Sequence, residues 1–478
     1  MKHLTIVQIN DTHAYFELHP ELFWAGNRAE YRPAGGYARI ATLLREIQTE
    51  HKSVLALDCG DTIHGTYAGV ESQGQALVPI LRRLPFAAMT AHWEFAYGPQ
   101  RLQEVAAQLR YPLLAANCYD KQSGERVFKP YIIHEAGDLR VGIVGLAAYI
   151  VDKVMPDSFS KGIRMTIGLD ELPPIIATLR REEKVDLIVV ISHLGFPQEM
   201  QLAQDVEGID VLLSAHTHNR LWAPARVNET LVMQSGSHGA FLGALTLEVD
   251  GRRVADFRHR LLVADAGITP DPAVADVVDG VLKPHRDLLN EVVGETRTAL
   301  NRATLLESTM DNFLLQSLLH VQEAQVAFSH GWRYGAPIPT GPVTREQLYN
   351  IVPMNPALFT VELTGEEIWT MLEQNLEKVF ARNPYEQLGG YVKRCLGLNC
   401  YIKIENPPER RIQELFIRGE KVQPDRTYSA VYITTQGVPE QLGNRRQKLE
   451  MRAVEAMERY LQEAGPARAE LQGAFTAI

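Results

Sequence analysis

Short apolar runs rich in β-branched residues alternate with amphipathic helical stretches along the first half of the chain. Polar side chains follow directly after several of these runs. We predict strands over residues 4–9, 53–57, 141–146, 187–191, 211–214 and 231–234, and helices over residues 36–50, 73–84, 168–183 and 197–206. This alternation is typical of a layered α/β fold, in which loops at the carboxyl ends of the strands build the functional site.

The length of the chain, 478 residues, is roughly three times a common domain of about 150 residues. A Gly/Pro/Asp-rich stretch near residues 267–272 precedes a helical segment that Pro284 should kink or break. We therefore predict a first domain over 1–266, a linker helix over 267–293 and a smaller α/β domain over 294–478. In the second domain we expect helices over 305–323, 365–379 and 446–463, and strands over 326–329, 401–405 and 428–434.

The composition excludes several classes of protein. Hydrophobic residues make up 45% of the chain and charged residues 22%, which excludes wholesale disorder. The net charge of −10 argues against a general nucleic-acid binder. Four cysteines are too few for a disulfide framework, and no stretch approaches the roughly 20 apolar residues of a membrane span. We expect a cytoplasmic protein that binds neither nucleic acid nor membranes, or a periplasmic one if a leader has been removed.

Acidic and histidine side chains recur just after the predicted strands. Singly, such residues are more often turn formers or packed imidazoles. Together they supply oxygen and imidazole ligands without a thiolate, a set that suits Mn, Fe, Zn or Mg. Two ions fit better than one, because six ligands overfill a single catalytic ion that must keep an open position. The six residues are Asp11, His13, Asp61, His193, His216 and His218.

These motifs resemble the calcineurin-like metallophosphoesterases, and specifically their 5′-nucleotidase branch, over nearly the whole chain. The resemblance implies a layered β-sandwich flanked by helices that carries two metal ions, followed by a smaller α/β substrate-binding domain. It implies that Asp11, His13 and His218 hold one ion and that His193 and His216 hold the other. It also implies that Asp61 bridges the two ions.

A fourth motif departs from the family pattern. The family has Asn-His-Glu-Phe-Asp-Tyr-Gly where this chain has His-Trp-Glu-Phe-Ala-Tyr-Gly at residues 92–98. The resemblance implies that His92 replaces the metal-binding Asn, whereas Trp93 and Ala96 replace the proton donor and the Asp that orients it. An alkoxide leaving group needs a general acid, but a thiolate, with a conjugate-acid pKa of about 8.5, can depart unprotonated.

The His-Trp-Glu-Phe run resembles the thiosulfohydrolase branch of the bacterial sulfur-oxidising (Sox) system, which hydrolyses a cysteine S-sulfonate on a carrier protein. Residues 328–335 and 383–390 of the second domain resemble the same branch. Asp61 and Arg333 are therefore the predicted catalytic residues. The predicted substrate-binding residues are Trp93, Trp332, Arg333, Tyr385, Gly389 and Gly390. Surface pairing of Arg333 and a tight turn at the two glycines are the simpler alternatives.

Three functions follow from these observations. The first is a two-metal hydrolase, with manganese favoured, in which metal-activated hydroxide attacks an S-sulfonate or another anionic ester with a good leaving group. Its substrate would be a small anion or a thiol-carrier S-sulfonate, in sulfur oxidation. The alternative is a 5′-nucleotidase or phosphomonoesterase of nucleotide catabolism, and a third interpretation is a non-catalytic ligand-binding homologue. His64, His238 and His330 are candidates for residues that contact the metal or substrate ligands and orient them without binding the ion themselves.

Overall fold

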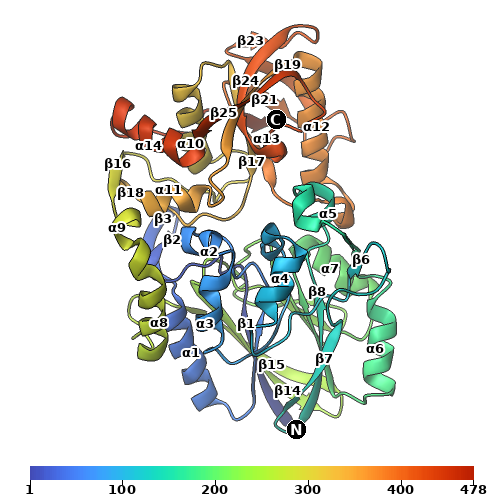
Figure 1. Cartoon of the computed structure of the whole chain (residues 1–478). Coiled ribbons are helices and arrows are strands. Elements are labelled where there is room, and N and C mark those ends of the chain that lie inside the picture. The colour runs from blue at the N-terminus through green and yellow to red at the C-terminus, as the bar shows by residue number, and fades with distance from the viewer. The chain divides into compact units, whose positions relative to one another are not determined.

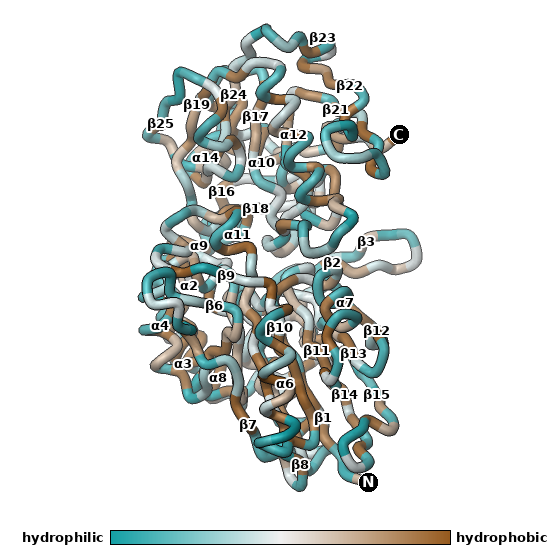
Figure 2. The backbone as a smooth tube through the Cα atoms, turned by 90° about the vertical axis from the view of Figure 1, so that its right-hand side faces the viewer, coloured by the Kyte–Doolittle hydropathy of each residue, from teal (hydrophilic) through white to brown (hydrophobic).

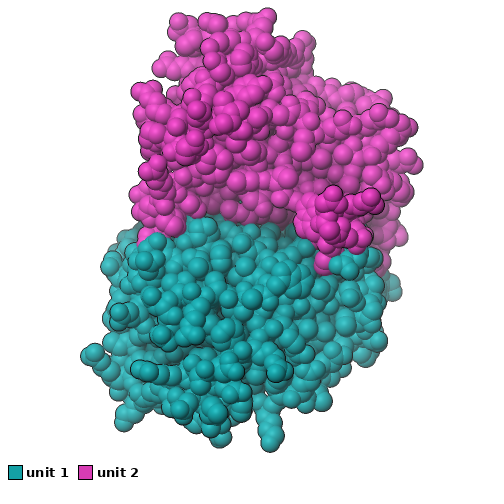
Figure 3. Space-filling view, turned by 180° about the vertical axis from the view of Figure 1, so that it is seen from behind, with its two compact units in different colours: residues 1–21, 32–284 teal, residues 22–31, 285–478 magenta.

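The computed structural model describes all 478 residues. Tertiary contacts divide them into two compact units, which Figure 3 colours separately: residues 1–21 with 32–284, and residues 22–31 with 285–478. The second division, between Pro284 and His285, falls inside the predicted linker. Residues 22–31 are the outer part of a hairpin formed by β2 (His19–Ala25) and β3 (Arg28–Ala34).

Unit 1 contains two main sheets. One has the order β15-β14-β1-β4-β5, and its strands are β1 (Lys2–Ile9), β4 (Val54–Asp58), β5 (Phe86–Met89), β14 (Phe241–Asp250) and β15 (Arg253–Val263). The other has the order β12-β13-β11-β10-β8-β7, and its strands are β7 (Tyr131–Ala136), β8 (Leu139–Leu146), β10 (Leu187–Ser192), β11 (Val211–Leu213), β12 (Ala225–Val227) and β13 (Thr230–Met233). A small pair is formed by β6 (Cys118–Asp120) and β9 (Ile163–Met165).

One hydrophobic core joins the two sheets. Ile6 and Leu57 of the first sheet belong to the same buried cluster as Val189 and Leu213 of the second. Figure 2, which colours the backbone by the hydropathy of each residue, shows hydrophobic residues along β1, β10 and β11. Burial of these apolar faces is the main force that holds the sandwich together.

Helices cover the sandwich, and α1, α3 and α8 lie side by side (Figure 1). The α-helices of unit 1 are α1 (Tyr37–Glu50), α2 (Tyr67–Glu71), α3 (Val78–Leu81), α4 (Pro99–Ala106), α5 (Val151–Val154), α6 (Leu172–Arg181), α7 (Phe196–Asp205) and α8 (Pro272–Leu282). Its 3₁₀ turns are η1 (Gln75–Leu77), η2 (Trp93–Tyr97) and η3 (Asp157–Ser160). The predicted layered α/β fold is confirmed.

Unit 2 is a smaller α/β unit with its own core. Its main sheet has the order β20-β17-β24-β19-β25, with β17 (Val326–Gly331), β19 (Ala357–Thr364), β20 (Tyr391–Leu396), β24 (Thr427–Ile433) and β25 (Asn444–Arg452). A second sheet, β23-β22-β21-β26, contains β21 (Leu398–Ile402), β22 (Ile412–Ile417), β23 (Glu420–Lys421) and β26 (Phe475–Ala477), and β16 (Val292–Thr296) pairs with β18 (Gly341–Thr344).

The helices of unit 2 are α9 (Arg286–Leu289), α10 (Thr309–Val321), α11 (Arg345–Ile351), α12 (Gly365–Phe380), α13 (Thr434–Gly437) and α14 (Ala453–Ala464), with the 3₁₀ turn η5 (Pro384–Glu386); η4 (Lys283–His285) crosses the unit boundary. The helix α12 begins with a capping box, in which the Thr364 side chain accepts from Glu367 N–H while the Glu367 side chain accepts from Thr364 N–H. None of the helices in the chain combines the length and apolar character that crossing a membrane requires.

Three predicted helices are wrong in part. The helix expected over 446–463 begins only at Ala453, because residues 444–452 pair with β19 as the edge strand β25. The helix expected over 73–84 is reduced to η1 and α3, since Gly74 adopts a left-handed φ of 80°. The helical segment expected over 273–293 does break at Pro284, but β16 begins at Val292.

Candidate dinuclear metal centre

The seven predicted metal ligands all follow strands of unit 1. Asp11 and His13 come after β1, Asp61 after β4, and His92 after β5. His193 follows β10, and His216 and His218 follow β11. Strands β1, β4 and β5 run parallel in one sheet, and β10 and β11 run parallel in the other, so each set of loops lies at one edge of its sheet.

The structure brings these seven side chains together as two groups. Asp11, His13 and His218 form one group, in which Oδ1 of Asp11 lies 3.3 Å from Nε2 of His218. Asp61, His92, His193 and His216 form the other. Within each group, one ligand atom from every residue lies within 4.8 Å of the others. Each group can therefore hold one divalent ion, and the division matches the one that the family resemblance implied.

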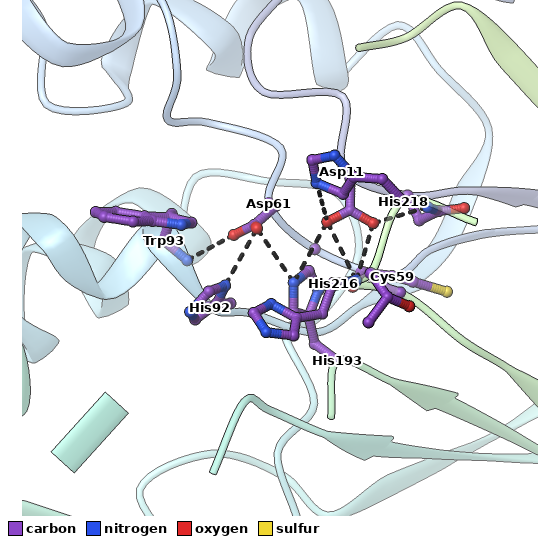
Figure 4. A network of polar contacts seen from close by, with 12 residues as sticks. Asp11, Cys59, Asp61, His92, Trp93, His193, His216 and His218 are labelled. Carbon is purple, nitrogen blue, oxygen red and sulfur yellow. Dashed lines mark hydrogen bonds and ion pairs between the residues drawn. The ribbon is translucent and has the colours of Figure 1, made fainter. Parts of the chain in front are cut away.

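Asp61 contacts both groups (Figure 4). Its Oδ2 atom lies 3.1 Å from Nδ1 of His92 and 3.2 Å from Nε2 of His193. The same oxygen lies 3.7 Å from Nε2 of His13, in the other group. A carboxylate oxygen that faces imidazoles of both groups occupies the place that a bridging ligand needs.

The imidazole nitrogens of this cluster face one another and the carboxylates, as the ligands of metal ions do. Nε2 of His13 and Nε2 of His218 face each other at 3.2 Å, and burial lowers the pKa of His13 to about 3. Nε2 of His92 is buried and has no hydrogen-bond partner, and Nε2 of His193 is buried between the carboxylates of Asp61, at 3.2 Å, and Asp11, at 3.5 Å. Buried polar atoms are rarely left without a partner. Divalent cations between these nitrogens and the carboxylates would satisfy all of them.

Backbone carbonyls orient two of the imidazoles. Nδ1 of His13 lies 3.1 Å from the carbonyl oxygen of His64, and Nδ1 of His193 lies 2.6 Å from that of Cys59. When Nδ1–H donates to a carbonyl, Nε2 is aimed into the site. There a cation would replace the proton that the carboxylates of Asp61 and Asp11 favour on His193, whose pKa they raise to about 10 despite burial. Metal-binding histidines in proteins have this arrangement.

The backbone around the centre is strained. Five of the seven predicted ligands are non-glycine residues with φ between 47° and 71°: Asp11, His13, Asp61, His216 and His218. The left-handed region is uncommon for such residues, and each instance costs on the order of 1–3 kcal/mol. Strain of this kind persists where surrounding structure enforces it, and it is concentrated at functional sites.

Glu94 is a supporting residue to which the sequence analysis assigned no role. Its fully buried carboxylate accepts backbone N–H groups of Thr62 at 2.6 Å, His92 at 2.8 Å and Asp61 at 3.3 Å. Burial and the charge of Asp61 raise the pKa of Glu94. One carboxylate thus joins the loop that carries Asp61 to the turn that carries His92. Its position between two motif residues was the only sequence signal.

Trp93 and Ala96 lie beside this centre and offer no titratable side chain. The Trp93 indole stacks on the His64 imidazole, with ring centroids 4.8 Å apart and planes 19° from parallel. The backbone N–H of Trp93 donates to Oδ1 of Asp61 at 2.6 Å (Figure 4). His64 is buried, and this burial lowers its pKa to about 4. An indole and a methyl group do not transfer protons at neutral pH.

A third cluster of ligand-type residues adjoins the first group. It consists of His19, Glu21 and His238, of which the sequence analysis had singled out only His238. Burial alone would raise the pKa of Glu21, but His238, His19 and Arg220 hold it well below its usual value. Burial lowers the pKa of His238 to about 4. The carboxylate is therefore ionised and the imidazole neutral at pH 7.

Comparisons with known families agree with the two-unit fold. The calcineurin-like phosphoesterase family matches residues 4–220, and the 5′-nucleotidase C-terminal domain family matches residues 291–436. The chain combines a domain of the calcineurin-like phosphoesterase family with a 5′-nucleotidase C-terminal domain. The prediction of a hydrolase that acts on ester bonds is confirmed by this membership and by the relatives of the phosphoesterase.

Three similar proteins illustrate the range of this family. The trifunctional nucleotide phosphoesterase protein YfkN of Bacillus subtilis is 26% identical over 89% of this phosphoesterase, which spans 31% of that longer protein. The structure of sulfate thiohydrolase SoxB of Thermus thermophilus is 24% identical and covers 99% of this chain and 96% of its own, with a TM-score of 0.92. A 5′-nucleotidase precursor, also of Thermus thermophilus, is likewise 24% identical, covers 100% and 99%, and has a TM-score of 0.88.

Two of the predicted substrate-binding residues of the 5′-nucleotidase C-terminal domain, Arg333 and Gly390, contact each other. Nη2 of Arg333 donates to the carbonyl of Gly390 at 3.1 Å, and its guanidinium lies 5.1 Å from the Tyr391 ring centroid. Trp332 is buried beside Tyr334, with ring centroids 5.9 Å apart. Tyr385 lies in η5, and Gly389 follows it in the same loop.

Gly390 lies close to a neighbouring side chain. With φ of 77°, it is so near His330 that a Cβ atom would lie 2.8 Å from Nε2 of that imidazole. A side chain at this position would displace the loop that accepts the Arg333 hydrogen bond. Burial and nearby cations lower the pKa of His330 to about 3, so this imidazole is neutral.

Proposed function

We propose that this phosphoesterase hydrolyses an anionic ester whose leaving group departs without receiving a proton. An S-sulfonate and an aryl phosphate are the two substrate types of this kind. The observation that carries the proposal is the pair Trp93 and Ala96, because neither of these two positions beside Asp61 carries a proton-donating side chain. The rest of the centre, with its two complete groups of ligands, supports turnover and argues against a purely binding role.

The chemistry of leaving groups explains why this substitution is tolerable. An alkoxide is strongly basic, and a positioned general acid typically accelerates its departure by about 10²–10⁴-fold. A thiol has an ordinary pKa of about 8.5 and a phenol one of about 10, so their anions are stable enough to leave unprotonated. A site without a general acid therefore retains activity mainly toward such substrates.

The roles of the remaining residues follow from their positions. Two divalent ions, of which we propose manganese because the ligands are carboxylates and imidazoles, would supply Lewis-acid activation of water and substrate. Asp61 would bind both ions. Glu94 holds together the loop that carries Asp61 and the turn that carries His92. Arg333 has a planar guanidinium suited to two oxygens of a sulfonate or phosphate, and it is the proposed anion-binding residue of the C-terminal domain.

A cytoplasmic location would reduce the number of candidate substrates. All four cysteines are buried and none forms a disulfide, which supports a reducing compartment. A small thiol S-sulfonate, such as glutathione S-sulfonate, would be available there. A thiol-carrier S-sulfonate is the corresponding protein substrate.

A nucleotide is the second candidate substrate. The match of residues 291–436 to the 5′-nucleotidase C-terminal domain and the similarity to a nucleotide phosphoesterase favour it. A nucleotidase of this sequence would need a proton donor other than residues 93 and 96. The two candidates therefore differ in how strongly the rate depends on leaving-group pKa.

The experiment compares kcat/KM on a panel with Mn²⁺ added: AMP, a series of aryl phosphates of graded phenol pKa, and glutathione S-sulfonate. We expect a steep decline of rate with rising leaving-group pKa and slow hydrolysis of AMP. Equal kcat/KM for AMP and p-nitrophenyl phosphate would contradict the proposal and favour the nucleotidase. No turnover on any substrate by protein that carries two ions would favour the non-catalytic homologue.

A further inference from the structure

The third cluster is separate from the seven ligands described above. His19 and Glu21 lie on β2, and His238 lies in the loop between β13 and β14, more than 200 residues along the chain. One ligand atom from each of the three residues lies within 4.8 Å of the others. Glu21 is 2% exposed, His238 is 5% exposed and the side chain of His19 is 9% exposed, so most of the cluster is shielded from solvent.

The hydrogen bonds leave the ligand atoms facing one another. Nδ1 of His19 lies 3.1 Å from the carbonyl of Glu17, and as a donor there it leaves Nε2 unprotonated. Nε2 of His19 is buried, lies 3.7 Å from Oε2 of Glu21 and has no hydrogen-bond partner. Arg220 donates to the other carboxylate oxygen, Oε1, at 2.6 Å. Oε2 of Glu21 is thereby directed at the two imidazoles.

The surroundings hold the rings in place. Tyr15 packs against both imidazoles, with its ring centroid 4.4 Å from that of His19 and 4.9 Å from that of His238. A Cβ atom on Gly35, whose φ is 99°, would lie 2.3 Å from Cε1 of His19, so glycine makes the room that this ring occupies. His238 has a left-handed φ of 58°, as five of the predicted metal ligands do.

We propose that His19, Glu21 and His238 bind a third divalent cation, beside the group formed by Asp11, His13 and His218. Two imidazoles and one carboxylate are a known ligand set for Zn²⁺, Mn²⁺ and Fe²⁺. The His238 ring centroid lies 5.8 Å from that of His218, so the third ion would be a neighbour of the dinuclear centre. The proposal concerns metal content and does not depend on the substrate proposed above.

The alternative to a bound ion is a buried hydrogen-bond network without an ion, in which Arg220 pairs with Glu21. Nδ1 of His238 lies 2.9 Å from Oε2 of Glu21, and Arg220 neutralises the carboxylate. That network satisfies Glu21 and Nδ1 of His238 but leaves Nε2 of His19 and Nε2 of His238 without a hydrogen-bond partner. The Arg220 side chain is 25% exposed, and solvent screens its repulsion of a cation. An ion is the arrangement in which all three residues are engaged.

The test measures metal content of the whole chain. The protein is stripped with a chelator, reloaded with Zn²⁺ alone or Mn²⁺ alone, dialysed and measured by plasma mass spectrometry. We expect three equivalents per chain for the unmodified protein and two for Glu21→Gln, with Glu17→Gln as the matched control at three. Two equivalents for the unmodified protein at saturation, unchanged in Glu21→Gln, would overturn the proposal.

Two further variants keep the test valid if Glu21→Gln does not fold. They also distinguish a bound ion from a hydrogen-bond network without an ion. His19→Phe keeps a packed ring on Tyr15 and is expected to bind two equivalents even if Glu21→Gln fails to fold. Arg220→Gln removes the opposing positive charge, so it should bind the third equivalent at least tenfold more tightly. If the affinity for the last equivalent is unaffected by both variants, the three residues form a network without an ion.

Discussion

The backbone N–H of Trp93 donates a hydrogen bond to Oδ1 of Asp61 at 2.6 Å. The residue at the position where the family resemblance implies a proton donor thus still holds the proposed bridging carboxylate, through an atom that every residue except proline supplies. The side chain at this position was free to change without loosening the centre. Loss of the acid and retention of the metal ligands are therefore compatible.

Restoring the acid should restore activity on alkyl esters. In the variant Trp93→His/Ala96→Asp, with His92→Asn to complete the family motif, kcat/KM for AMP should rise at least tenfold, because a positioned acid contributes about 10²–10⁴-fold. The rate on p-nitrophenyl phosphate should change much less. Trp93→Phe is the control, since it keeps an aromatic ring without a proton. Equal gains on both substrates would contradict the lost-acid interpretation.

Asp61→Asn should lower metal occupancy in both groups. An amide oxygen carries no charge, and Asp61 is the carboxylate whose Oδ2 atom faces His13 as well as His92 and His193. Metal analysis after dialysis against micromolar chelator would show the loss. Asp58→Asn, at the end of β4 but outside both groups, is the control. Full occupancy in Asp61→Asn would exclude a bridging role.

His92→Ala should empty one group selectively. His92 shares its group with His193 and His216, and its ring forms a hydrogen bond and ion pair with Asp61 of the same group. Loading with Co²⁺ and recording the absorption of each ion as it binds would separate the two equivalents. Loss of the ion held by Asp11, His13 and His218 instead would mean that the motif is assigned to the wrong ion.

The clustering of the candidate metal ligands could be predicted because the fold places strand ends together. Asp11, Asp61 and His193 follow continuous apolar runs, and in α/β folds such positions converge. Glu94 could not be predicted to join two loops, because its partners are backbone N–H groups that carry no sequence signal. Glu21 sits on a strand that the hydrophobic pattern did not reveal.

The strand β25 shows a second limit of the sequence pattern. Its residues, 444–452, are mostly charged and carry the good helix formers Gln, Lys, Leu, Glu and Met. Pairing with β19 overrides that propensity, because the edge of the sheet offers backbone hydrogen bonds that no local pattern announces. The helix was therefore predicted to begin several residues too early.

Glu94→Gln should weaken both stability and metal binding. The carboxylate accepts four backbone N–H groups in a buried position, and a hydrogen bond to a charged group contributes about 1.5–3 kcal/mol. We expect a loss of roughly 1–3 kcal/mol in the free energy of unfolding. Chemical denaturation measures this free energy. The control is Glu104→Gln, because Glu104 is an exposed residue that forms an ion pair with Arg101. A variant as stable as the parent would show that Glu94 does not hold the loops.

Lys393 gives a pH dependence of stability that the metal centre does not affect. Its ammonium group is buried in the C-terminal domain, where Nζ donates to the carbonyls of Gln436 and Gly437 at 2.7 Å each. Burial lowers the pKa of Lys393 from 10.5 to about 8. Between these two pH values the unfolded chain binds more protons than the folded one. Stability therefore rises with pH through this window, and the contribution is unfavourable below about pH 8.

The measurement compares urea denaturation at pH 7 and at pH 10 for the unmodified chain and for Lys393→Met. The unmodified chain should gain on the order of 3 kcal/mol relative to the variant over this range, because each pKa unit corresponds to about 1.4 kcal/mol. Other groups titrate in the same window, but they do so equally in both proteins and cancel in the difference. Lys421→Met, at a side chain 62% exposed, should show the pH dependence of the unmodified chain. Parallel pH profiles for the unmodified chain and Lys393→Met would mean that the buried amine keeps its ordinary pKa.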